Sequence, residues 1–270
     1  MNNCLFSLEN INYSYSKTTP DIIKNLNMKI YKNDIVTILG KNGIGKTTLL
    51  KILTGQLKGY RGTIKIDDVD IRKINTRELS KKIGYVPSAT SRYQDLSVMD
   101  YLVTGYANQL NLFQTPSDLM YEKAYEFLQT IGKEFLFKQN ISYLSSGEMQ
   151  LVNIGRVLLQ NPNIIIFDEP TANLDINNQL LIIEKMKELS SKEYTLIMTS
   201  HNPGQALSLG GKTLLMSEDY YIFDETSKVL TAENLSRIYG LPVSMVKDEN
   251  GKIICSKFES NGINKSNLYF

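Results

Sequence analysis

The residues best suited to do chemistry begin with a glycine-rich stretch near the start of the chain. This stretch reads Gly40-Lys41-Asn42-Gly43-Ile44-Gly45-Lys46-Thr47 and fits the pattern G-x-x-x-x-G-K-[ST]. It follows an apolar run of strand length, Ile35–Leu39, and precedes a helical pattern over Lys46–Gln56. In this setting glycines let successive backbone N–H groups face an anion, and the helix N-terminus adds its positive dipole. The alternative is an ordinary glycine turn followed by an exposed lysine.

The types of these residues predict a triphosphate site. We expect Lys46 to reach the β- and γ-phosphates of a nucleotide and the Thr47 hydroxyl to ligate Mg²⁺. The residues expected to bind the nucleotide here are Gly40, Asn42, Gly43, Gly45, Lys46, Thr47 and Thr48.

Such a site needs an acidic partner for the metal, and a second stretch supplies it. The apolar run Ile164–Phe167 ends in Asp168 and Glu169. Open α/β sheets bind ligands at the carboxyl ends of their strands. We expect Asp168 to hold Mg²⁺ through water, and Glu169 to orient and deprotonate the attacking water. The alternative is two solvated acids at a strand end.

Length and composition indicate what could position these groups. The chain has 270 residues, of which 42% are hydrophobic and 21% charged, as in an ordinary globular protein with one large α/β unit. A net charge of +2 gives no support to nucleic-acid binding. Cys4 and Cys255 are expected to be free thiols in a reducing cytoplasm. No apolar run approaches the roughly 20 residues of a membrane span, and we expect no secretory signal.

The hydrophobic pattern changes along the chain. The first 75 residues are strand-rich, with a predicted hairpin over Gly62–Ile71. Strand signals are then absent from about 88 to 161, where Tyr121–Ile131 and Glu148–Leu159 have helical periodicity. Beyond this insertion the sequence predicts four elements and a poorly patterned tail: strand Asn163–Phe167, helix Asn177–Ser190, strand Thr195–Thr199, a hairpin over Lys212–Phe223, and the tail from about Leu241 with a disordered last dozen residues.

A third motif carries a family resemblance. The stretch Tyr143-Leu144-Ser145-Ser146-Gly147-Glu148-Met149-Gln150 opens a predicted helix and resembles the signature loop, L-S-G-G-Q/E, of ABC transporter ATP-binding subunits. The order of the motifs is similar as well: glycine-rich loop, helical insertion, signature, Asp168-Glu169, Thr171–Asp175 and a histidine. The resemblance covers roughly Leu5 to His201.

The resemblance implies a fold and a domain division. The fold class is α/β, with a P-loop NTPase core: a mixed sheet with helices on both sides, an antiparallel β subdomain and an inserted helical subdomain. A single ATPase domain would span residues 1–245, with the core in 1–87 and 162–240, the helical subdomain in 88–161 and a C-terminal tail in 246–270.

The resemblance also implies roles for residues outside the glycine-rich loop. Tyr15 falls where the family stacks a ring on adenine; packing in a half-buried strand is the alternative. Asp175 matches the acid that crosses the interface of a head-to-tail dimer. His201, the single histidine of the chain, matches the switch histidine that contacts the γ-phosphate, although a structural role is its alternative. The signature residues, expected to bind ATP held by a second copy of the chain, are Leu144, Ser145, Ser146, Gly147 and Glu148.

The sequence departs from the family pattern at several positions. Pro87-Ser88 stands where the family has Pro-Gln, whose glutamine reaches Mg²⁺ and the attacking water; Gln94 in the same loop is a candidate replacement. Ser146 replaces the second signature glycine and adds a Cβ where backbone approaches phosphate. Met149 and Leu151 stand where arginines are frequent. Because no expected phosphate ligand, metal ligand or base is lost, we expect hydrolysis to survive, slowly and with altered coupling.

The function implied is that of the ATPase motor of an importer. Its cofactors would be ATP and Mg²⁺. Its partners would be a second copy of itself, a transmembrane permease and, indirectly, an extracellular or periplasmic substrate-binding protein, with no nucleic acid. The chain would act at the cytoplasmic face of the membrane. Val229–Val243 and Ser200–Ala206 resemble ATPases of iron–siderophore, haem and cobalamin importers. The alternative for the first stretch is a structural helix capped by Thr231 and Gly240.

Three other functions stay open at this point. A nucleotide-binding regulator with weak ATPase activity is motivated by Ser88 and Ser146. An ABC-type ATPase of the DNA-repair or ribosome-acting kind is disfavoured by a single cassette and the low net charge. A small kinase or GTPase shares the glycine-rich loop but has no reason for the signature.

Overall fold

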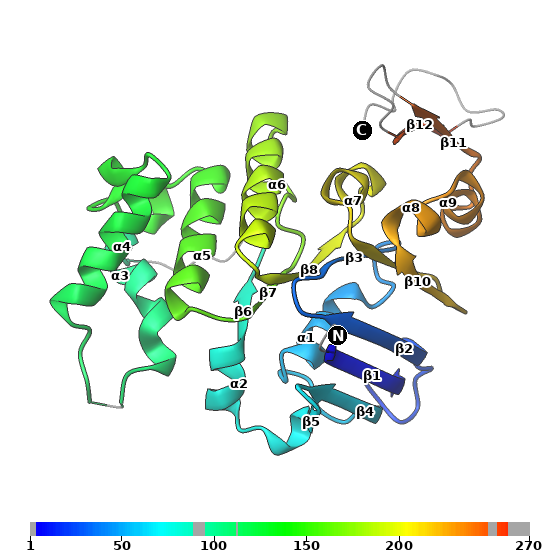
Figure 1. The fold of residues 1–270 in the computed structure, drawn as a ribbon, viewed down its shortest axis with the longest axis horizontal. Helices are drawn as coiled ribbons and strands as arrows, with labels where there is room; N and C mark the ends of the chain where they lie inside the picture. The colour runs from blue at the N-terminus through cyan, green and yellow to red at the C-terminus, as the bar shows by residue number, and fades with distance from the viewer. Residues whose placement is uncertain (1–3, 89–94, 112, 248–252, 259–270) are drawn as a thin grey trace.

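The computed structural model describes residues 4–88, 95–111, 113–247 and 253–258 of the chain. A central sheet carries helices on both sides, a separate antiparallel sheet lies next to it, and a group of helices extends from its far edge (Figure 1). This arrangement confirms the predicted fold class, an α/β P-loop NTPase core with an antiparallel β subdomain and a helical subdomain.

The central sheet is mixed, with strand order β10-β9-β3-β8-β7-β6. The five strands from β9 to β6 pair in parallel, and β10 pairs antiparallel with β9. All four residues of β7 are fully buried, as expected of an apolar strand covered on both faces. The strands are β3 (Ile35–Leu39), β6 (Ile83–Val86), β7 (Ile164–Phe167), β8 (Thr195–Ser200), β9 (Lys212–Met216) and β10 (Tyr221–Glu225).

The second sheet is antiparallel, with strand order β2-β1-β4-β5. The turn between β4 and β5 consists of Asp67 and Asp68, both with positive φ, and a pair of such residues matches the twist of a tight hairpin. The hairpin predicted over Gly62–Ile71 is thereby confirmed. The strands are β1 (Cys4–Tyr13), β2 (Ile23–Tyr31), β4 (Arg61–Ile66) and β5 (Val69–Asp70).

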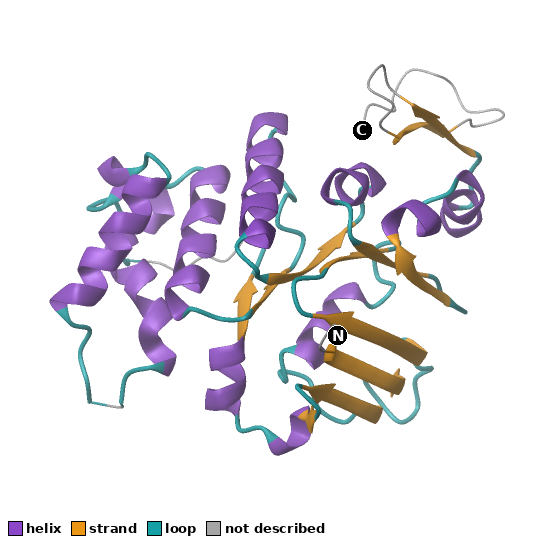
Figure 2. Ribbon diagram, in the orientation of Figure 1, coloured by secondary structure: helices purple, strands orange, loops and turns teal. Residues whose placement is uncertain are grey.

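The helices that the sequence predicts begin and end within a few residues of the predicted bounds, whereas the other α-helices, of seven residues or fewer, have no counterpart in the sequence prediction. Figure 2 shows helices on both sides of the central sheet. The helices are α1 (Lys46–Leu53), α2 (Thr76–Lys82), α3 (Val98–Val103), α4 (Asp118–Thr130), α5 (Ser146–Gln160), α6 (Ile176–Ser191), α7 (Pro203–Leu209), α8 (Thr226–Val229) and α9 (Ala232–Tyr239). Short 3₁₀ segments lie at Ile71–Lys73, Thr104–Asn108, Glu134–Leu136 and Ile141–Tyr143.

Helices α3, α4 and α5 enclose a hydrophobic cluster of their own. Tyr101 is buried in it, and Leu96 and Met99 pack against it. These apolar side chains therefore contribute to the core of the helical subdomain. Gln94 and its neighbour Tyr93 lie outside the described residues.

The C-terminal part differs from the sequence prediction at one place. Helix α9 has the expected caps: the Thr231 side chain accepts the Asn234 N–H, and Gly240 is left-handed. The tail predicted to be poorly patterned instead forms an antiparallel hairpin of β11 (Val243–Lys247) and β12 (Ile253–Phe258), so that prediction was wrong for these residues. The signal overlooked was two short apolar runs separated by a polar stretch. The last dozen residues lie outside the described part of the chain.

Close packing of α4 on α5 depends on one glycine. A Cβ built at Gly155 would overlap the Phe127 ring. We expect Gly155→Ala to lower the free energy of unfolding by about 1–3 kcal/mol, because the ring must shift inside a packed cluster. Urea unfolding followed by circular dichroism measures it. Lys123→Ala, on the exposed face of α4, is the control, and equal stability of the two variants would contradict the packing argument.

Candidate functional site

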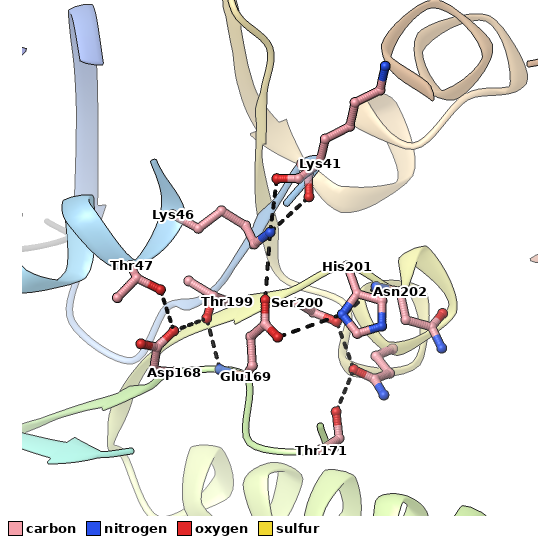
Figure 3. Close-up of polar contacts among 12 residues, drawn as sticks. Lys41, Lys46, Thr47, Asp168, Glu169, Thr171, Thr199, Ser200, His201 and Asn202 are labelled. Atoms are coloured by element: carbon pink, nitrogen blue, oxygen red, sulfur yellow. Dashed lines mark hydrogen bonds and ion pairs between the residues drawn. The ribbon is translucent and has the colours of Figure 1, made fainter. Parts of the chain in front are cut away.

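The predicted phosphate-binding, metal-binding and catalytic residues converge where three neighbouring parallel strands end. The glycine-rich loop follows β3, Asp168 and Glu169 follow β7, and His201 follows β8 (Figure 3). Because β8 pairs in parallel with both β3 and β7, these three carboxyl ends meet at one edge of the sheet.

The glycine-rich loop turns sharply into α1. Gly45 precedes the helix with φ of +105°, and a Cβ there would lie 2.6 Å from the Ile22 side chain, so only glycine fits both the conformation and the space. Beside the loop is a pocket of about 190 Å³. The pocket is lined by Tyr15, Ile22, Asn42, Gly43, Gly45, Lys46, Thr47, Thr48 and Glu169.

Lys46 carries its ammonium group into this loop with only 5% of the residue exposed. The ammonium donates to the carbonyl oxygens of Gly40 at 2.9 Å and Lys41 at 3.2 Å, and it lies 3.7 Å from Glu169 Oε1. Burial lowers the pKa of Lys46, and the nearby carboxylates of Glu169 and Asp168 oppose that shift. The result is a desolvated cation aimed at the centre of the loop.

Asp168 is held by three hydroxyl groups. Its Oδ1 accepts from Thr199 at 2.8 Å and from Thr47 at 3.1 Å, and its Oδ2 accepts from the Tyr85 hydroxyl at 3.0 Å. Burial and then the Asp168 charge raise the pKa of Tyr85, which keeps its hydroxyl protonated as a donor. The carboxylate is therefore fixed in orientation beside Thr47.

The chemistry of these donors fits magnesium. Thr47 and Asp168 place two hard oxygen atoms side by side, the ligands that Mg²⁺ prefers. Across the part of the chain that the structure describes, no group of three or more His, Cys, Asp or Glu residues is arranged to hold a metal.

Glu169 has a left-handed backbone, with φ of +47°. Its N–H donates to Thr199 Oγ1 at 2.9 Å, so one buried threonine hydroxyl bonds both adjacent acids. The Glu169 carboxylate lies between Lys46 and His201, whose Nδ1 is 3.8 Å from Oε2 (Figure 3). A non-glycine residue in this conformation costs free energy, so Thr199 helps to maintain it.

Tyr15 lies at the edge of the pocket. Its hydroxyl is 2.9 Å from Thr48 Oγ1, and its ring packs edge-on against Tyr13 with centroids 5.2 Å apart. With 59% of the residue exposed, Tyr15 does not pack into the core. The ring remains available to a flat ligand, and stacking on adenine stays a prediction.

The signature residues form a second group. Ser145 caps α5, and Glu148 bonds back to the Ser145 N–H in a complete capping box. Asp175 caps α6 and accepts both backbone and side-chain N–H bonds from Asn178, whose amide covers Gly147 so closely that a Cβ there would be 2.5 Å away. The structure thus joins the signature to the Asp175 segment. Leu144 is half-buried nearby, and Ser146 is exposed.

Ser88 lies two residues beyond the carboxyl end of β6, next to the strand that carries Asp168. Sequence reasoning missed Tyr85 and Thr199, whose hydroxyl groups hold Asp168. Polarity at the end of a buried strand was the available signal for Thr199, and the Tyr85 hydroxyl had no comparable one.

A family model described as ABC transporter matches residues 23–172. The molybdate import ATP-binding protein MolC of Haemophilus influenzae is 33% identical over 90% of each chain. A probable iron chelatin transport ATP-binding protein of Helicobacter pylori is 33% identical over 93% of this chain and 98% of that protein. A solved metal-chelate type ABC transporter in an inward-facing conformation superposes with a TM-score of 0.81 and 30% identity, over 94% of this chain and 98% of that one.

The region that matches the family model includes both the glycine-rich loop and the Asp168-Glu169 pair. The match extends over more than half of the chain, and the curated relatives align along nearly all of it. The chain therefore belongs to the ABC transporter family, among the ATP-binding ATPases of that family.

Proposed function

We propose that this chain is the ATP-hydrolysing subunit of an importer for an iron complex, haem or cobalamin, acting through a separate permease. The observation that carries the catalytic part is the convergence of Lys46, Glu169 and His201 at one edge of the sheet. The cargo class is supported by the iron chelatin name of one relative and the metal-chelate type of the solved neighbour. Another relative is named for molybdate import, so the names of the relatives support more than one class of cargo.

Lys46 binds the triphosphate in this proposal. Its ammonium exchanges the Gly40 and Lys41 carbonyl oxygens for β- and γ-phosphate oxygens, while the N–H groups of the loop and of the α1 N-terminus face the phosphates. Thr47 and Asp168 would hold Mg²⁺. Bound there, Mg²⁺ would neutralise part of the triphosphate charge. Tyr15 offers its exposed ring to the adenine.

Glu169 is the general base. Its carboxylate orients the attacking water and accepts the water proton, and Lys46 and His201 hold that carboxylate between them. His201, 59% exposed on its side chain, reaches the γ-phosphate. Ser88 occupies the position where the family has a glutamine, so the base works without that contact.

A second copy of the chain completes the site. The signature residues Leu144 to Glu148 open α5, whose N-terminus presents N–H groups to a γ-phosphate held by the other copy. Asp175 crosses the interface beside them. Because Asn178 binds Asp175 and covers Gly147, the two elements are presented as one surface.

The remaining partners and the location follow from this function. Across the described residues no helix is both long and apolar enough to cross a membrane. We therefore assign the membrane passage to the permease, with this chain bound at its cytoplasmic face and a substrate-binding protein acting indirectly. We propose no nucleic-acid partner. The domain division 1–245, with a helical subdomain at 88–161 and a tail from 246, belongs to the same proposal.

A second candidate function is nucleotide binding with weak or regulatory turnover, uncoupled from transport. Ser88 and Ser146 favour it, because one shortens the reach toward the attacking water and the other adds a Cβ at the signature. Steady-state hydrolysis by the unaltered chain separates the two functions: binding of Mg·ATP without turnover, with the permease present, would favour the second.

Glu169→Gln tests the proposed base. We expect the variant to bind Mg·ATP, to hydrolyse it about 100-fold or more slowly, and to double in mass with Mg·ATP, because the amide cannot accept the proton. Hydrolysis assays and light scattering measure these effects. Glu184→Gln, an exposed position on α6, is the control. Unchanged hydrolysis in Glu169→Gln would remove Glu169 from the mechanism.

The buried Lys46 makes stability depend on pH. Its folded-state pKa is lowered from 10.5, so between that lowered value and the unfolded value the unfolded chain binds more protons. Stability of the unaltered protein should therefore rise with pH through this window, relative to Lys46→Met. Urea unfolding at neutral and alkaline pH measures the difference, with Lys123→Met as the matched control. If the free energy of unfolding of Lys46→Met instead rises relative to that of the unaltered protein as pH increases, the burial argument is contradicted.

A further inference from the structure

A glutamine that has no assigned role lies directly behind the His201 loop. Helix α7 starts two residues after His201, and the Asn202 side chain caps it by accepting the Gly204 N–H at 2.8 Å. Gln205 stands in the first turn of this helix, half-buried. Its side chain therefore faces the protein only four residues from His201.

The Gln205 amide oxygen accepts two hydrogen bonds from residues of different segments. Ser200 donates to it at 2.8 Å and Thr171 at 3.0 Å, and these two residues are 3% and 6% exposed. An amide oxygen has two lone pairs, so both are used. Ser200 in turn accepts the Asn202 N–H at 3.0 Å, which continues the chain of bonds through the His201 loop.

The other end of this contact is the turn between Glu169 and Asp175. In that turn the Ala172 N–H donates to the Glu169 carbonyl oxygen at 3.0 Å. The Gln205 amide nitrogen lies 3.4 Å from Gln179 Oε1, and Gln179 donates to the Leu174 carbonyl oxygen at 2.9 Å. Gln205 therefore contacts the start of the turn through Thr171 and its end through Gln179.

Backbone pairing does not extend to this point. The ladder between β7 and β8 ends at Phe167 and Met198, so Glu169 and His201 lie beyond it. The 3.8 Å between His201 Nδ1 and Glu169 Oε2 is then set in part by side-chain bonds, two of which end on the Gln205 amide oxygen. Removing the amide would leave the buried Ser200 and Thr171 hydroxyls without this acceptor. Because an unpaired buried hydroxyl costs free energy, we expect both segments to move until these groups find other partners.

We propose that Gln205 is a positioning residue that fixes the His201 loop against the Thr171–Asp175 turn. Through it, the placement of His201 at the γ-phosphate and the placement of Asp175 at the dimer interface are set together. The catalytic part of this inference rests on the proposed function. Gln205 itself touches no reacting atom; it acts through Ser200 and Thr171.

The kinetic test compares two variants: Gln205→Leu removes both the acceptor of Ser200 and Thr171 and the N–H donor to Gln179, whereas Gln205→Glu retains the acceptor and loses only that donor. In the full chain with Mg·ATP, we expect Gln205→Leu to lower kcat about tenfold with KM changed less than about twofold, and Gln205→Glu to restore most of kcat. Gln129→Leu, on the exposed face of α4, is the matched control. The double variant His201→Ala/Gln205→Leu should be no slower than His201→Ala.

A second measurement does not depend on turnover. Amide hydrogen exchange of the unliganded chain should rise about tenfold in both 200–205 and 171–175 in Gln205→Leu, and return toward the unaltered rates in Gln205→Glu. If the unaltered chain neither binds nor hydrolyses Mg·ATP, the proposed function fails, while the exchange data still decide whether Gln205 joins the two segments.

Several results would overturn the inference. Exchange that rises in α7 alone would show that Gln205 supports only its own helix. Three kinetic results would show that Gln205 does not act through His201. The first is an unchanged kcat in Gln205→Leu, and the second is a Gln205→Glu variant as slow as Gln205→Leu. The third is a double variant that is slower than His201→Ala by the full effect of Gln205→Leu.

Discussion

Burial of the Lys46 ammonium is the constraint on which the rest of the site depends. An ammonium group that is nearly closed to water is stable only with several polar partners within reach. Two of these are carbonyl oxygens of its own loop, which explains the tight glycine turn, and the third is the Glu169 carboxylate from another strand. The sheet order that sets β3 and β7 on either side of β8 is what brings that carboxylate into place.

From this cluster the structure extends along one short segment. The segment begins with Asp168 and Glu169 and ends with Asp175, the cap of α6. Between them, Thr171 donates to Gln205, and the Leu174 carbonyl oxygen accepts from Gln179. The segment thus passes from the proposed catalytic edge to the surface that, in our account, faces a second copy. Because Asn178 packs on Gly147, the helical subdomain touches the core at this same surface. In our account, this contact would carry a change at the triphosphate to the surface that faces a second copy.

Sequence predicted the parts of this arrangement that are encoded locally. The glycine-rich loop, the strand before Asp168 and the caps Thr231 and Gly240 all depend on residues within a few positions of one another, and the structure places them as expected. The ATP, magnesium and dimer roles of those residues remain predictions.

What sequence could not predict depends on contacts between distant segments. The Tyr85 hydroxyl on β6 donates to Asp168, which follows the neighbouring strand β7. Gln205 on α7 accepts from Thr171, which lies in the turn after Glu169. Short helices such as α2 and α7, with about two turns each, have too few residues for a periodic pattern to stand out. The hairpin of β11 and β12 was missed because its two apolar runs are short and show little pattern.

The central claim is that the buried Lys46 is held ready for a triphosphate. A crystal structure of the full chain with Mg²⁺ and a non-hydrolysable ATP analogue tests it most directly. We predict that the Lys46 ammonium leaves the Gly40 and Lys41 carbonyl oxygens for the β- and γ-phosphates, with Glu169 and His201 beside the γ-phosphate. A triphosphate bound elsewhere, or bound here with the Lys46 bonds unchanged, would contradict the account.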